Sequence, residues 1–217
     1  MTVLVLLAAY LPAAGGDAVS LFSRPIRHFS IGKTSALDAL FWLGRDERVC
    51  IGIEFSGSDL RRDVQVEVDQ STLGEVVKKI LGSSDAYQLS VSDGVILIRK
   101  KGINPPAWLD HELTEFELPR TGVMVAGNVL WMALETEMNP SQRGFAGDYP
   151  PTDPTDEVGP FHERRETVRQ ILNKIVAGSR GAGWCLSAEG TRVSFPAAVN
   201  RFWTLVSYNG QTAARPK

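Results

Sequence analysis

The same helical pattern, with the same start signal, occurs twice in this chain, 95 residues apart. Thr72 and Thr167 each stand three residues before a Glu or Gln, which is the spacing of a capping box at the start of a helix. The apolar residues that follow have helical spacing and match pairwise at this offset: Leu73, Val76, Val77, Ile80 and Leu81 with Val168, Ile171, Leu172, Ile175 and Val176. The recurrence predicts two copies of one unit, with unrelated α+β structure as the alternative.

Alternating apolar residues around the first of these helices predict a compact unit at residues 28–101. Gly82 should end the helix, and Asp93-Gly94 is the preferred two-residue turn of a β-hairpin. Strands are expected at 29–31, 49–55, 64–68, 87–91 and 95–98, and helices at 35–43 and 71–81. We therefore expect two helices packed on a short mixed β-sheet.

A similar order follows a linker that contains Pro105-Pro106. The expected fold class is α+β, with two small domains, each of two helices on a short mixed sheet. The chain divides into a signal peptide at 1–18, a first domain at 28–101, a linker at 102–111, a diverged second copy at 112–208 with a Pro/Gly-rich insertion at 139–160, and a tail at 209–217. In the second copy we expect helices at 125–138 and 167–176 and strands near 184–186 and 201–208.

The first residues resemble a secretory signal. An apolar stretch at 3–11 is followed by small residues at 13–18, as in a signal peptide with its cleavage zone. The stretch is shorter than the ~20 residues that span a bilayer, so no membrane span is expected after cleavage. A retained anchor and a buried N-terminal element are the alternatives. The expected location is the periplasm, or another site reached by export.

A family resemblance extends over most of the first predicted domain. It is carried by Phe29-Ser30-Ile31, the helix that begins at Ser35, the strands at 51–55 and 64–68, the helix at 71–81 and the closing hairpin. Their order resembles the short N-terminal domain of bacterial secretins and TonB-dependent transducers. Gly74 within the second helix departs from that pattern. The resemblance implies a non-enzymatic adaptor or sensor of the cell envelope that binds an envelope protein.

The composition and motifs do not favour other classes of function. The chain has a net charge of −2, and its 23 Lys and Arg are scattered, so a nucleic-acid partner is not expected. His28, His111 and His162 lack the spacing of metal ligands, and no nucleophile or phosphate-binding motif occurs. We therefore expect no catalytic residue, no cofactor and no metal.

Two other functions remain open. One is an envelope enzyme with its site around His162 and Glu163, and the other is a structural subunit of an envelope assembly. The acidic residues of the insertion lack calcium-loop spacing and indicate a solvated loop; they are Asp148, Asp153, Asp156 and Glu157.

The two cysteines fall one in each predicted domain. Cys50 and Cys185 each alternate with apolar neighbours, so each side chain should point away from the core of its own domain. A disulfide between them would form if those outer faces approached, and two separate thiols are the alternative.

The resemblance also suggests how a partner binds. In the family pattern the closing hairpin ends at an edge of the sheet, where an added strand gains main-chain hydrogen bonds. The expected edge strand, and so the expected binding site, consists of Val95, Ile96, Leu97, Ile98 and Arg99.

Overall fold

The computed structural model describes residues 21–54, 57–82, 84–138, 157–179, 183–186, 193–197 and 201–204. The fold is α+β, as expected. The predicted signal peptide at 1–18, most of the insertion at 139–160 and the tail at 209–217 lie outside the described residues. Within the described ranges, no helix has both the length and the apolar character needed to cross a membrane.

Six strands drawn from both halves of the chain form one sheet, in the order β14-β13-β12-β2-β5-β4. Their bounds are β2 Cys50–Ile53, β4 Tyr87–Ser92, β5 Val95–Lys100, β12 Gly183–Leu186, β13 Val193–Ala197 and β14 Arg201–Thr204. The expected separate sheet in each half is therefore corrected to a shared one. The two halves meet where β2 pairs in parallel with β12, with Gly52 opposite Trp184.

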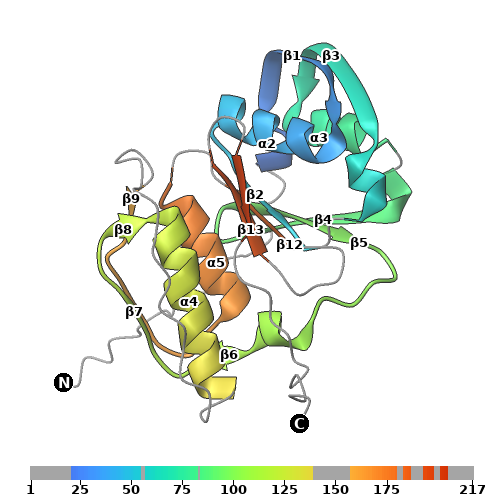
Figure 1. Ribbon diagram of the computed structural model, residues 1–217. Helices are drawn as coiled ribbons and strands as arrows, with labels where there is room; N and C mark the ends of the chain where they lie inside the picture. Colours follow the sequence, from blue (N-terminus) through green and yellow to red (C-terminus); the bar gives the residue numbers. More distant parts are fainter. Residues whose placement is uncertain are drawn as a thin grey trace, which may run out of the picture.

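Two pairs of helices cover opposite faces of this sheet (Figure 1). On one face lie α2 (Ala36–Glu47) and α3 (Leu73–Leu81), and on the other lie α4 (Val123–Met138) and α5 (Val168–Ala177). Because successive side chains of a strand point to opposite faces, β5 contributes to both cores. Ile96 and Ile98 pack with α2 and α3, whereas Val95 and Leu97 pack with α4 and α5.

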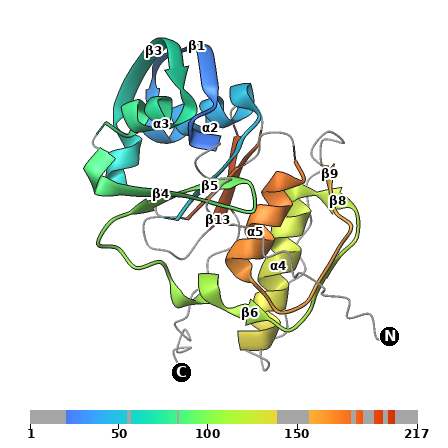
Figure 2. The ribbon, with the colours of Figure 1, turned by 180° about the vertical axis from the view of Figure 1, so that it is seen from behind.

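Each half also has a two-stranded antiparallel ribbon, and the two ribbons lie at opposite ends of the molecule (Figure 2). The first pairs β1 (Pro25–Ser35) with β3 (Asp63–Thr72). The second pairs β6 (Glu112–Leu113), β7 (Phe116–Leu118) and β8 (Thr121–Gly122) with β11 (Glu166–Thr167), β10 (Phe161–Glu163) and β9 (Glu157–Val158). One register runs through all three pairings, from Thr167 opposite Glu112 to Glu157 opposite Gly122.

Each ribbon leads directly into a helix, β3 into α3 and β11 into α5, and the two junctions have the same local structure. Both predicted capping boxes are confirmed, with Thr72 and Thr167 as the N-caps of α3 and α5. Gln70 and Arg165, again 95 residues apart, both have a left-handed backbone, with φ of 51° and 54°. The two halves thus share local geometry at corresponding positions, whereas their independence as domains stays a prediction.

Capping residues set both ends of helix α2. The Ser35 hydroxyl accepts a hydrogen bond from the Asp38 N–H at the N-terminus. The helix continues four residues beyond the expected end at 43, until Arg48 adopts a left-handed backbone with φ of 53°. Charged residues between 45 and 48 therefore form its last turn, and the amide of Arg48 bonds to the carbonyls of Arg45 and Gly44.

Candidate functional site

The strand expected at the sheet edge lies in the interior of the sheet. Strand β5 pairs with β4 on one side and with β2 on the other, so the prediction that Val95, Ile96, Leu97, Ile98 and Arg99 form a free edge is wrong. The sequence holds a signal for this placement. Val95 to Ile98 is a continuous apolar run, which indicates a strand buried on both faces, whereas β4 alternates.

Among the described strands of this sheet, β4 is an edge, because its pairing is with β5 alone. Its sequence, Tyr-Gln-Leu-Ser-Val-Ser, contains neither a charged residue nor proline, and its register with β5 is regular from Tyr87 to Ser92. Proteins protect exposed edges with charges, prolines and bulges. Strands β1 and β3, each paired on one side, carry such charges, including Lys33 and Asp63. Strand β4 therefore lacks these protections.

The two cysteines lie on opposite faces of the shared sheet. The Cys50 Sγ donates a hydrogen bond to the Val176 carbonyl oxygen at 3.2 Å and packs with α4 and α5, and burial raises the pKa of its thiol. Cys185 is buried in the other core, with α2 and α3. Each side chain thus points into the core of the other half. Neither cysteine forms a disulfide, and the predicted bond between them is ruled out because the sheet separates the two side chains.

The pair proposed for an enzyme, His162 and Glu163, does not converge. The two residues are adjacent on β10, so their side chains point to opposite faces of the ribbon. The Glu163 carboxylate accepts a hydrogen bond from Lys174 Nζ at 2.7 Å, which holds it against α5. The other histidines form separate pairs, His28 with Asp69 and His111 with Glu137.

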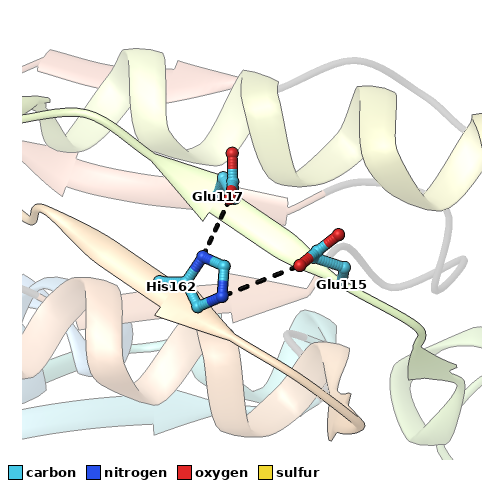
Figure 3. Close-up of side chains that lie close together, drawn as sticks. All are labelled: Glu115, Glu117 and His162. Atoms are coloured by element: carbon cyan, nitrogen blue, oxygen red, sulfur yellow. Dashed lines mark ion pairs between the residues drawn. The ribbon is translucent and has the colours of Figure 1, made fainter.

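His162 lies instead between two carboxylates on the exposed face of the second ribbon (Figure 3). It stands opposite Glu117 in the β7–β10 pairing, and Glu115 lies two residues before Glu117, on the same face. Nδ1 of His162 is 2.8 Å from Oε1 of Glu117, and Nε2 is 3.6 Å from Oε1 of Glu115. All three side chains are exposed, by 46% to 69%.

Sequence reasoning missed this cluster because it depends on the register between two strands that lie far apart in the chain. The available signal was the Glu-x-Glu alternation in a predicted strand, which places both carboxylates on one face. Of the acidic residues singled out in the insertion, Asp148, Asp153 and Asp156 lie outside the described residues. Glu157 forms an ion pair with Arg120.

A second charged group lies at the junction of the halves, around a buried carboxylate. Glu54 follows β2 and is 2% exposed. Its carboxylate accepts hydrogen bonds from Nε of Arg99 on β5 and, at 2.6 Å, from Nε of Arg169 on α5. Arg169 also pairs with Asp110. This group has the burial and the partners of a structural contact that fixes α5 against the end of the sheet.

Asn173 forms another polar contact between the halves. This fully buried residue of α5 accepts a hydrogen bond from Trp184 Nε1 at 3.0 Å. Its amide nitrogen donates to the Ser92 carbonyl oxygen and to the Asp93 carboxylate, in the turn between β4 and β5. The hairpin that carries the edge strand is thereby held by the second half of the chain.

Within the part of the chain that the structure describes, two features therefore offer a site, namely the unprotected strand β4 and the His162 cluster. Comparison with protein-family models, with curated proteins and with solved structures found no match.

Proposed function

We propose that this chain is an exported, non-enzymatic interaction module of the bacterial cell envelope, with a secretin/TonB-type short N-terminal domain at residues 28–101. The single observation that carries the interaction is strand β4, an edge of six residues without charge, proline or bulge. The export and the envelope location rest on the N-terminal sequence and on the family resemblance.

The binding mode that fits this edge is β-strand addition. A partner strand beside β4 would gain main-chain hydrogen bonds without a preformed pocket. Leu89 and Val91 are partly buried against the core beneath α2 and α3, while Gln88 and Ser90 are exposed. The partner strand should therefore alternate apolar and polar residues in the same way. Since β4 carries no charge, binding should depend only weakly on salt.

Photo-crosslinking in cells tests this proposal most directly. A photoreactive residue at Ser90 should crosslink to an envelope protein, whereas the same residue at Ser30 should not. Ser30 is the matched control, because it is also an exposed serine on a strand, but its strand, β1, belongs to a ribbon protected by charges.

A charge at the edge provides the complementary test. Ser90→Lys should weaken capture of the crosslinked partner by at least about tenfold, because lysine on an edge strand opposes the addition of another strand. Ser30→Lys should leave capture unchanged. Equal capture by both variants would contradict the binding mode. Proline at Ile96 or Ile98 is not a suitable probe, because β5 is internal and its loss of hydrogen bonds would disrupt the sheet.

Export is tested separately by mass spectrometry of the envelope fraction. The mature chain should begin between residues 15 and 21, after the small residues of the cleavage zone. An intact chain found in the cytoplasm would contradict export while leaving the β4 interaction to be judged on the crosslinks.

A further inference from the structure

We propose that Glu115, Glu117 and His162 form a Zn²⁺ site on the exposed face of the second ribbon. One donor atom from each side chain lies within 4.8 Å of the other two, so a single ion between them can reach all three after small side-chain rotations. The backbone positions are set by adjacent strands, because Glu117 stands directly opposite His162. This site is independent of the interaction proposed for β4.

The donor set selects the class of ion. An imidazole nitrogen with carboxylate oxygens suits Zn²⁺, which binds such ligands at about 2.0–2.2 Å. Ca²⁺ and Mg²⁺ prefer sites made of oxygen ligands, and Ca²⁺ takes six to eight of them. Three protein ligands leave coordination positions open, and the exposure of the cluster lets water fill them.

One distance around His162 is close to what a shared ion requires. Its Nε2 is 3.6 Å from the Glu115 carboxylate, which is too long for a hydrogen bond. Two ligands at about 2.1 Å from one tetrahedral Zn²⁺ lie roughly 3.4 Å apart, close to this distance. Glu117 Oε1 lies 2.8 Å from Nδ1, on the other side of the ring, so its exposed carboxylate must leave this contact and rotate toward Nε2 to bind the same ion.

Arg164 competes for one of the ligands. Its Nη2 and Nε lie 3.0 Å and 3.1 Å from Oε1 of Glu115. Binding of Zn²⁺ must displace this cation from the carboxylate or share the carboxylate with it. If the cluster were only a set of cross-strand ion pairs, the chain would bind no Zn²⁺ at this place, with or without Arg164. If it is a metal site, removal of Arg164 should strengthen binding.

The first ribbon provides a control within the same chain. The capping boxes and the ribbon entries align the halves, so that Glu115, Glu117 and His162 correspond to His28, Ser30 and Glu67. There His28 pairs with Asp69 at 2.7 Å. Among the described residues, a group of three close donor side chains occurs only on the second ribbon.

The test is a calorimetric titration of the untagged chain with Zn²⁺, with Co²⁺ absorption as a second readout of nitrogen and oxygen ligation. We expect one bound ion per chain. His162→Ala and Glu117→Gln should each weaken binding by at least about tenfold, Arg164→Ala should tighten it several-fold, and His28→Ala should change nothing.

Circular dichroism establishes that each variant is folded before its titration is interpreted. The proposal is overturned if the folded wild-type chain binds no Zn²⁺, or if His162→Ala binds it as tightly as the wild type. It is also overturned if His28→Ala and His162→Ala weaken binding equally, since the ion would then not be held by the second ribbon.

Discussion

Glu54 stands where the end of β2 meets the N-terminal part of α5. Its buried carboxylate accepts hydrogen bonds from Arg99, which is partly exposed, and from Arg169, which keeps Asp110 as a second partner. We expect Glu54→Ala to lower the free energy of unfolding by about 1.5–3 kcal/mol in urea denaturation, because it removes hydrogen bonds to a charged group. Glu67→Gln, at an exposed position on β3, should change it by less than about 0.5 kcal/mol.

Tyr87 provides a prediction about pH. Burial, and then the hydrogen bond from its hydroxyl to Asp59, raise the pKa of Tyr87 well above the ordinary value of 10.0. Above pH 10 the Tyr87 hydroxyl therefore keeps its proton in the folded chain, whereas it loses this proton in the unfolded chain. The resulting stability is fully present below pH 10 and is lost as the pH rises further.

Tyrosinate absorbance measures this shift. While the chain remains folded above pH 10, wild type and Tyr87→Phe should show the same ionised amplitude, and the extra amplitude of the wild type should appear only on unfolding. One additional tyrosine ionising near pH 10 in the folded wild type would contradict the predicted shift.

Individual side chains were predicted correctly where strand alternation alone decides their direction. Cys50 and Cys185 point away from the cores of their own halves, as their neighbours indicate. The residues that each cysteine contacts could not be predicted from the sequence, because they depend on how the two halves pack together. The same alternation that suggested a disulfide placed the two thiols on opposite faces.

The starts of α3 and α5 are local features, and local features were predicted well. In both capping boxes the threonine hydroxyl and the following Glu75 or Gln170 satisfy each other's backbone N–H groups. We expect Thr72→Ala and Thr167→Ala each to cost about 1 kcal/mol of unfolding free energy.

Serine is the matched control for both caps, since it keeps the hydroxyl. In urea denaturation, Thr72→Ser and Thr167→Ser should remain close to the wild type. The positions are far enough apart that the two alanine effects should add in the double variant. Equal losses for serine and alanine would show that the hydroxyls do not cap these helices.

Strand partners were predicted less well than strand positions. The strands at 87–91 and 95–98 were located within two residues, and the Asp93-Gly94 turn has the positive φ values expected of it. Which of the two strands meets β2 is decided by contacts across the sheet. The His162 cluster was missed for the same reason, because hydrophobic spacing carries no information about cross-strand register.

Sharing of one sheet makes the two halves depend on each other. If the first half stood alone, it would expose the face of Cys50, Val95 and Leu97 that now packs with α4 and α5. A chain cut before Gly102, an exposed position, should therefore form a stable complex of its two fragments. Size-exclusion chromatography should show one peak that contains both.

A substitution in the shared face distinguishes this association from chance binding. Leu97→Asp places a charge in the second core and should separate the fragments, whereas Ser90→Asp, at the exposed edge, should not. Fragments that elute separately without any substitution would show that the halves are independent domains, as the sequence pattern suggested.

The seam between β2 and β12 contains two glycines with reciprocal neighbours. A methyl group at Gly52 would lie 2.7 Å from Trp184, and one at Gly183 would collide with Phe41. Each half thus supplies an aromatic ring and receives the ring of the other. Two first halves placed side by side would lack this complement. If molecules exchange halves at high concentration, the fit therefore favours dimers in which the first half of each chain joins the second half of the other, and disfavours pairing of like halves.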